Sequence, residues 1–540
     1  MTATTTTATS STRISTTTAA RKHALAGTGH LLAAALRRDR VLLPVFVLLI
    51  IVVLVGAGTT VSSTYPTPEA VQDRYDQIQA LPMFVLFQSQ AFAATAEALV
   101  AQQAFGGTTI FAAIGAVLFV VRHTRSEEQR GRLELVRSAA VGHAAPLAAA
   151  VILVGVAGLV IGLVSAAGLA ASGLPPAGSL LLGLVGTGAV WVATAITAVL
   201  TQVFEHARTA GVVGLVVAYG LHFVRGLGHL VDAAWLTWAS PAGWLEGTRP
   251  FVGDRWWPLG LVLAFVAAAL AAAFALSARR DLGAGLIPTR SGRATAPGYL
   301  RGVVGMAWRQ NRTPFLVWAS AFVVIGLAFG AGGTAAVADY ANSPFAAEFA
   351  AAMNLDDPAI GFFVYVVFVL VFPVAAYAIL TVLRARHDET SGIAELTLAA
   401  PVSRVRWAAA SVGSALAGSA AILILIGLTL TVTAPDVDGV LALTLTLIPA
   451  VWVLIGVVTL AFGFVPRLTV PLAWVALTIG VFGEILVKAG LPDVVYLATS
   501  PFAHVSPYYT TPWSPFVLLA LAAVLITVGL LGMARRDLPR

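Results

Sequence analysis

The sequence contains no cysteine, which excludes disulfide bonds and metal sites built on thiolates. Charge is scarce as well: 11% of the 540 residues are charged, whereas 58% are hydrophobic and the mean hydropathy is +0.89. A chain of this composition has too few polar side chains to cover a soluble globular surface. We therefore expect an integral membrane protein that crosses the membrane many times.

Lysine is almost absent, because Lys22 and Lys488 stand beside thirty arginines. A P-loop that binds ATP phosphates needs the pattern G-x-x-x-x-G-K-[ST], and neither lysine lies in one. The chain is expected to bind no cofactor itself and not to be an enzyme on its own. A composition rich in alanine and arginine but poor in lysine is typical of GC-rich bacterial genomes, which favours a bacterial cell membrane as the location.

The net charge of +7 could indicate a nucleic-acid partner, but the charges lie between apolar runs, where orientation in the bilayer explains them. We therefore expect membrane lipids and no nucleic acid around the chain. The positive-inside rule places both termini, the charged loops and the central linker in the cytoplasm. Only five basic residues then lie at or near the outer face: Arg74, Arg225, Arg249, Arg255 and Lys488.

Apolar runs of about twenty residues, the length that crosses a bilayer, recur along the chain. We predict spans at 41–61, 105–121, 146–170, 178–202, 210–229, 257–277, 315–336, 359–383, 407–432, 439–464, 468–487 and 514–533. The fold class is thus all-α, with twelve transmembrane helices in two six-helix repeats. Because each repeat has an even number of spans, the repeats are parallel. The expected organisation is a disordered cytoplasmic tail (1–26), a first half (27–282), a linker (283–297) and a second half (298–540).

The strongest internal repeat is a charged loop that follows the second span of each half. The first loop is residues 125–140 (RSEEQRGRLELVRSAA) and the second loop is residues 386–401 (RHDETSGIAELTLAAP). The matching residues are Arg125 with Arg386, Glu128 with Glu389, Gly131 with Gly392, Glu134 with Glu395, and Leu135 with Leu396. A glycine lets a short helix turn along the membrane face, and the charges can pair with a soluble partner. We predict a duplicated docking surface; the alternative is that the charges only anchor the spans.

The loops, the interfacial helix before each first span and the aromatic segment before each sixth span resemble one family. The chain resembles the permeases of ABC exporters with the type V fold, in particular actinobacterial exporters of tetronasin and polyketide antibiotics. The most specific motif runs from Glu389 to Arg404 and ends in A-P-V-S-R; the first copy has Ala140 in place of Pro401 and His143 in place of Arg404. The resemblance covers nearly all of residues 27–538.

The resemblance implies that residues 126–140 and 387–401 carry coupling helices that dock on ATP-binding subunits. Two copies of such a subunit, holding ATP and magnesium, would then energise export of a hydrophobic or amphipathic small molecule. Export as the direction follows from the resemblance alone.

Two other classes remain as alternatives. An ion-coupled secondary transporter would need ionisable groups near the bilayer midplane, and the predicted spans hold almost none. A membrane-embedded enzyme acting on lipid-linked substrates would need clustered acidic residues at the outer face, but those at 69–97 and 339–357 are scattered. His206, His222 and His229 lack metal-ligand spacing with carboxylates, so no metal site is expected.

The repeat alignment makes Arg225 and Glu484 equivalent, each seventeen residues beyond an arginine at the inner end of its span. At 1.5 Å per residue both lie roughly 26 Å along their helices, in the outer part of the bilayer. We predict that they pair and help to close an outer gate; the alternative is that each reaches the outer interface separately. Tyr219, His222 and Tyr365 are further candidates for the pathway.

Overall fold

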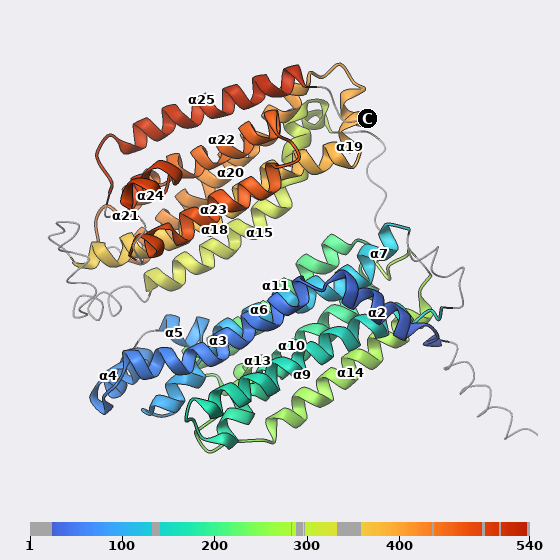
Figure 1. Ribbon diagram of the computed structural model, residues 1–540, viewed down its shortest axis with the longest axis vertical. Coiled ribbons are helices and arrows are strands. Elements are labelled where there is room, and N and C mark those ends of the chain that lie inside the picture. Colours follow the sequence, from blue (N-terminus) through green and yellow to red (C-terminus); the bar gives the residue numbers. More distant parts are fainter. Residues whose placement is uncertain are drawn as a thin grey trace, which may run out of the picture. The chain divides into compact units, whose positions relative to one another are not determined.

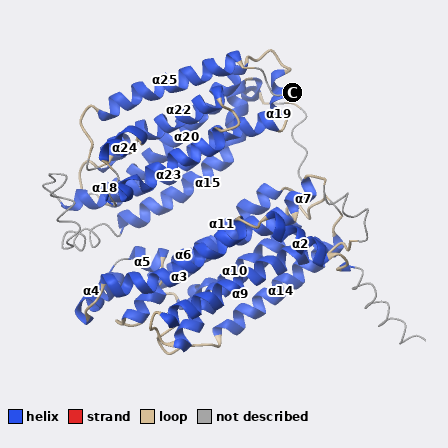
Figure 2. Cartoon of the chain, viewed as in Figure 1, coloured by secondary structure: helices blue, strands red, loops and turns tan. Residues whose placement is uncertain are grey.

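The computed structural model describes residues 24–80, 82–131, 141–281, 283–287, 295, 297–331, 358–434, 437–488, 492–506 and 509–536. All named elements of this part are helices, and the pairing of Phe204 with Ile287 is an isolated bridge (Figure 2). The chain divides into two compact units, residues 1–291 and 292–540. Each unit is described by itself.

The first unit is built around α10 (Pro176–Val203), which packs against α6 (Ala96–His123), α9 (Ala145–Ala171), α11 (Ala207–Leu230) and α14 (Pro258–Arg279) (Figure 1). Its other helices are α2 (Thr28–Arg38), α3 (Leu42–Thr64), α4 (Pro68–Ala80), α5 (Pro82–Phe87), α7 (Arg125–Gln129), α12 (Ala234–Trp238) and α13 (Pro241–Glu246). Gly162 and Gly183 let α9 and α10 touch, because a Cβ on Gly183 would lie 2.2 Å from the Gly162 carbonyl oxygen.

The second unit is built around α22 (Ile448–Phe464), which packs against α18 (Pro358–Thr390), α20 (Arg404–Thr433), α23 (Thr469–Lys488) and α25 (Ser514–Arg535). Its other elements are η1 (Gly298–Arg301), α15 (Val303–Ala331), α19 (Ile393–Leu398), α21 (Val440–Thr446), α24 (Asp493–Thr499) and η2 (Ala503–Val505). Gly463 and Gly529 make the close helix contact here, since a Cβ on Gly463 would lie 2.3 Å from the Gly529 carbonyl oxygen. Figure 1 shows α19 at one end of this unit and α24 at the other.

Ten helices of the described residues are long and apolar enough to cross a membrane, six in the first unit and four in the second. The expectation of a multi-pass, all-helical membrane protein is therefore confirmed. Helices α15 (29 residues) and α23 (20 residues) lie where the other two spans are predicted. The count of twelve and the parallel arrangement of the repeats stay predictions.

Backbone hydrogen bonds add detail at two predicted boundaries. Residues 24–26 belong to the folded part and not to a disordered tail, because Gly142 N donates to Ala26 O at 2.9 Å and Ala144 N to Ala24 O at 3.0 Å. The two units divide between residues 291 and 292, inside the predicted linker, whose first part is held to the first unit because Ile287 N donates to Val203 O at 3.1 Å. In both places backbone hydrogen bonds hold a segment that composition alone marks as polar.

Candidate functional site

The first loop is braced from inside by Arg125 and Glu128. Arg125 is 1% exposed, and it donates from Nε to the Thr201 carbonyl and from a terminal nitrogen to the Ala284 carbonyl at 2.8 Å. Glu128 accepts from Arg125 at 3.1 Å and from Arg280, just after α14, at 2.8 Å. The start of the loop is thereby tied to the C-terminal end of α10 and to the end of the last helix of the unit.

The second loop repeats this brace with its own residues. Arg386 donates from Nε to the Pro466 carbonyl, in the α22–α23 turn, at 2.9 Å. Glu389 pairs with Arg536, just after α25, at 2.7 Å, and lies 4.0 Å from Arg386. The same three roles, two arginines around one glutamate, recur in both units.

The brace changes the role expected for four of the predicted docking residues. The side chains of Glu128 and Glu389 are 4% and 1% exposed, and Arg125 and Arg386 point into the same pairs. Ionised groups removed from water need such partners, so these side chains hold the loop within the chain, and a direct contact of theirs with another protein stays a prediction. The pairing of Arg280 and Arg536 with the loops was missed, although the two helix ends match in the sequence as R-R-D-L.

The parts beyond the brace are the ones that can meet a partner. Gly131 and Gly392 have φ of +68° and +76°, a left-handed conformation that reverses the chain at little cost only for glycine. After Gly392 comes α19, whose Ala394 is buried while Glu395 is exposed and Leu396 is 80% exposed. The second loop thus presents a short helix with an uncovered leucine.

Three predicted docking residues remain. Glu134 and Leu135 lie outside the described residues, so the first loop's counterpart of α19 stays a prediction. Arg404, at the start of α20, donates to the Arg536 carbonyl. Arg404 therefore belongs to the brace of the second loop.

The interfacial helix α2 is fastened to the same end of the first unit. Arg38 forms an ion pair with Glu127 of α7, and Asp39, at the C-terminus of α2, pairs with His123 at 2.5 Å and with Arg122 at 3.0 Å. The second unit has a matching contact, in which Arg384 donates to the Asn311 side chain at 3.1 Å. These ion pairs therefore hold α2 and the start of the first loop together.

At the far end of the first unit lies a buried cluster of Arg225, Glu246 and His229, called here the Glu246 cluster. Arg225 is fully buried and pairs with Glu246 at 2.5 Å, and His229 contacts the other carboxylate oxygen at 2.7 Å. Arg225 also donates to the Val85 carbonyl at 2.9 Å, and Gln90 N donates to Glu246 at 2.9 Å. The cluster joins α11, the α12–α13 hairpin and the chain after α5.

His222 completes this end as a structural residue. Its Nε2 donates to the Phe87 carbonyl at 3.1 Å, and Nδ1 lies 3.0 Å from the Thr109 hydroxyl. Its ring stacks on Tyr219, with centroids 5.6 Å apart. No group of three potential metal ligands occurs in the part of the chain that the structure describes, and the histidines here are used in packing.

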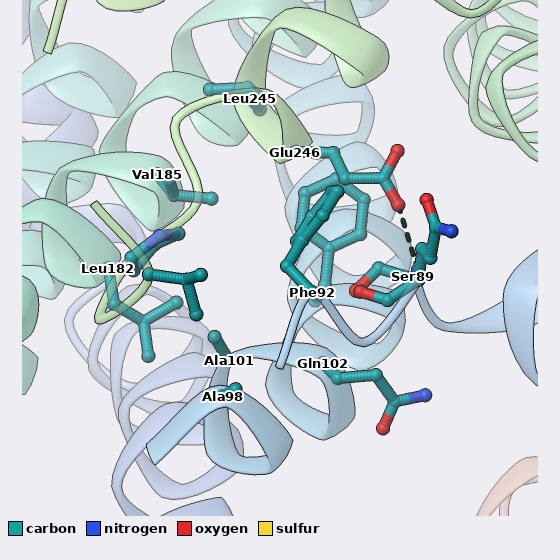
Figure 3. Close-up of a pocket in the computed structure, with 13 residues that line it drawn as sticks. Ser89, Phe92, Ala98, Ala101, Gln102, Leu182, Val185, Leu245 and Glu246 are labelled. Atoms are coloured by element: carbon teal, nitrogen blue, oxygen red, sulfur yellow. Dashed lines mark hydrogen bonds between the residues drawn. The ribbon is translucent and has the colours of Figure 1, made fainter. Parts of the chain in front are cut away.

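The chemistry open to Glu246 is limited by its neighbours. Burial alone would raise the pKa of this carboxyl, but the Arg225 guanidinium and the hydrogen bond from His229 bring it down to about 2. Beside it is a cavity of about 20 Å³, room for about one water molecule, and Figure 3 shows Glu246, Phe92 and Gln102 among the residues that line it. A permanent anion next to so small a space fits a structural clamp and not a binding site for cargo.

Comparison with known proteins connects these features to a family. The family described as "Multidrug efflux system permease Rv1217c, C-terminal domain" matches residues 300–534. The chain is 34% identical over 536 residues to the multidrug efflux system permease protein Rv1217c of Mycobacterium tuberculosis, with 96% of each chain covered. The chain belongs to this family of efflux permeases. The expectation of a membrane permease is confirmed, whereas the type V fold stays a prediction.

The predicted gate pair of Arg225 and Glu484 stays a prediction, and the structure gives Arg225 a partner within its own unit. Arg225 neither reaches an aqueous interface nor lacks a partner, because Glu246, 21 residues further along the chain, neutralises it. The side chain of Glu484 lies outside the described residues. Of the pathway candidates, Tyr219 and His222 pack beside the Glu246 cluster, and Tyr365 of α18 is 46% exposed in the second unit.

Proposed function

We propose that the protein is the membrane subunit of an ATP-driven ABC exporter that moves a hydrophobic or amphipathic small molecule out of the cell. Two copies of a separate ATP-binding subunit dock on the two charged loops and supply the energy. The observation that supports this most directly is the duplicated brace. Two loops, 261 residues apart, are held by equivalent arginine–glutamate–arginine pairs in a chain that has no P-loop of its own.

The brace suits a docking element because it keeps the start of each loop rigid, and in the second loop the short helix α19 beyond the brace is uncovered. A contact that transmits movement needs a stiff connection to the helices behind it, and buried ion pairs to the last helix give that stiffness. The exposed Leu396 and Glu395 offer the apolar anchor and the polar rim that protein interfaces use.

The nature of the cargo is inferred from the relative and from the apolar character of the spans. The relative's name describes a multidrug efflux system. In the second unit an apolar groove of about 680 Å³ runs along α22, α23 and α25, lined by side chains such as Leu460, Phe464 and Ile479. Cavities of this size and character favour hydrophobic or amphipathic molecules.

The alternative of ion-coupled transport gains one feature from the structure, since the Glu246 cluster is ionisable and buried. A carboxyl that carries and releases protons must titrate near the working pH. Glu246 is held ionised, with a pKa of about 2, so it fits a clamp better than a proton carrier. The ATP-driven reading is therefore the one proposed.

The test is to express the chain together with an ABC ATP-binding subunit from the same organism and to purify the pair through a tag on the permease. Co-purification in a ratio of two ATP-binding subunits to one permease, with ATP hydrolysis only when both are present, is expected. Leu396→Asp should abolish co-purification, because it puts a charge at the uncovered centre of the contact.

The matched control is Val494→Asp, which changes another exposed aliphatic side chain, in α24 at the opposite end of the second unit from α19 (Figure 1). It should leave the pair intact. Transport by the permease without any ATPase, or an intact pair in Leu396→Asp, would contradict the proposal.

A further inference from the structure

The α12–α13 hairpin of the first unit has an equivalent in the second, formed by α24 and η2. Ser240–Pro241 of the first matches Ser500–Pro501 of the second, an offset of 260 residues. The backbone hydrogen bond from Gly243 N to Ser240 O recurs from Ala503 N to Ser500 O. Equivalent positions can therefore be compared one by one.

In the first unit two tryptophans fill the space beside the hairpin. Trp238 stacks on Trp257, with ring centroids 5.2 Å apart and planes 8° from parallel. Trp244 donates from Nε1 to the Trp238 carbonyl at 2.7 Å, and its ring packs edge-on against Phe265 of α14 at 5.9 Å. Two indole rings thus occupy the gap between this hairpin and the last helix of the unit.

In the second unit both tryptophans are replaced by smaller residues. Ala498 stands at the position of Trp238, and His504 stands at the position of Trp244. Trp513, which precedes α25 as Trp257 precedes α14, has no ring at position 498 to stack on and is 74% exposed. The consequence is a cavity of about 390 Å³ between α22, the α24–η2 hairpin and α25, called here the hairpin cavity. Its size lies within the range of small-molecule sites.

The hairpin cavity has an apolar wall and a polar end. Val453, Val517 and Leu521 line the wall, whereas Ser500 and His504 line the polar end. Ser500 is 2% exposed, and its hydroxyl has no hydrogen-bond partner among the described residues. The equivalent Ser240 is satisfied, because its hydroxyl donates to the Leu221 carbonyl at 2.6 Å.

A buried hydroxyl without a partner is costly, so its presence at a cavity wall points to a ligand group that completes it. His504 supports this reading. Its Nε2 donates to the Leu497 carbonyl at 2.9 Å, which leaves Nδ1 of the neutral ring as an acceptor. The polar end therefore offers both a donor and an acceptor.

The hairpin cavity also continues into the apolar groove along α22, α23 and α25. Val457 and Thr499 line both spaces, and the groove is walled almost entirely by aliphatic side chains. An apolar molecule lying in the groove would thus reach the polar end without crossing a ridge of charged residues.

We infer that the hairpin cavity is a binding site for an amphipathic small molecule, with an aromatic ring system about as large as the missing indoles and one hydrogen-bonding group placed at Ser500 and His504. The inference rests on the proposed function in taking this molecule to be of the exported class. The site belongs to the second unit alone, because tryptophans fill its counterpart in the first.

The probe for the test is 4-hydroxybenzophenone, a phenol that inserts into nearby C–H bonds on illumination. The full-length permease in lipid nanodiscs, without any ATPase, is labelled and digested, and the modified peptides are identified by mass spectrometry. We expect labelling between residues 492 and 525. The variant Ala498→Trp/His504→Trp, which restores the first unit's residues, should reduce it at least tenfold.

The matched control is Ala523→Trp, which adds the same bulk at an exposed position of α25 outside the cavity and should keep the labelling of the unchanged protein. Ser500→Ala keeps the cavity open and removes one hydroxyl, so it should weaken labelling by about fivefold. The opposite change, Trp238→Ala/Trp244→His, should create new labelling between residues 234 and 265.

Undiminished labelling in the refilled variant would overturn the inference. So would benzophenone without its hydroxyl labelling as strongly as the phenol and ignoring Ser500→Ala, since that result identifies a space for lipid chains. Because no ATPase takes part, a failure here is separate from a failure of the proposed energy source.

Discussion

Removing the charge of Glu246 is the sharpest test of how the first unit is held together. Glu246→Gln keeps the shape of the side chain and deletes the counter-charge of Arg225, whose side chain is fully buried. Breaking a buried ion pair on one side costs about 3–5 kcal/mol, because the remaining charge has no compensation. Among its contacts the cluster holds Gln90 N, so the chain after α5 should loosen first.

Hydrogen–deuterium exchange measures that loosening directly. A loss of about 3–5 kcal/mol corresponds to about 2 to 3.6 orders of magnitude in the opening equilibrium, at about 1.4 kcal/mol for each factor of ten. Peptides covering residues 84–92 should therefore exchange roughly 100 to 4,000 times faster in Glu246→Gln. Since the folded pKa of about 2 lies below the ordinary 4.5, the clamp is complete above pH 4.5 and weakens as the pH falls towards 2.

Two comparisons make the result specific. Glu69→Gln, an exposed glutamate of α4, should change exchange little, and peptides of α20 in the second unit should be unaffected by either substitution. Unchanged exchange at residues 84–92 in Glu246→Gln would refute the argument that the Arg225–Glu246 ion pair stabilises this segment. Equal acceleration throughout both units would do so as well, because it would indicate global destabilisation.

The remaining predictions concern the loops. Glu395→Arg should weaken co-purification with the ATP-binding subunit more than Glu134→Arg, since the second loop keeps the full motif; equal, undiminished recovery of both variants would count against docking. Gly392→Ala should lower the thermal unfolding midpoint of the permease slightly, because a left-handed conformation costs an alanine roughly 1 kcal/mol while its Cβ meets no other atom; a midpoint as high as that of the unchanged protein would show that the turn is not strained.

Much of the fold could be predicted because a bilayer imposes one simple demand, a run of apolar residues long enough to cross it. The start of α6 is a part of the fold that this apolar pattern does not predict. The helix begins at Ala96, nine residues before the predicted span, capped by the Thr95 hydroxyl. Gln102 lies in this polar first part and is buried against the Gln88 side chain at 2.8 Å. Composition marks such a segment as a loop, since its partner lies elsewhere in the chain.

The sequence was enough to locate the two charged loops, but it could not predict which residues their side chains contact. Comparing the two loops found Glu128 and Glu389 because a repeat preserves positions. It could not show that each glutamate forms an ion pair with an arginine about 150 residues further along the chain, Arg280 or Arg536. The same logic pairs Arg225 with its repeat equivalent, and it could not show that Arg225 has a partner within its own unit, Glu246 in the neighbouring hairpin. Equivalence between copies says nothing about neighbours within one copy.

Each loop is held by an arginine just after the last helix of its unit, so the residues that follow that helix help to fix the position of the loop. Arg536 lies four residues before the end of the sequence, and its side chain is one of the two that hold Glu389. A truncation that stopped at Arg535 would keep every helix of the second unit and still unfasten its loop. Truncation after Arg535 is therefore expected to remove the Arg536–Glu389 ion pair of the second loop, while the first loop stays unchanged and serves as an internal control.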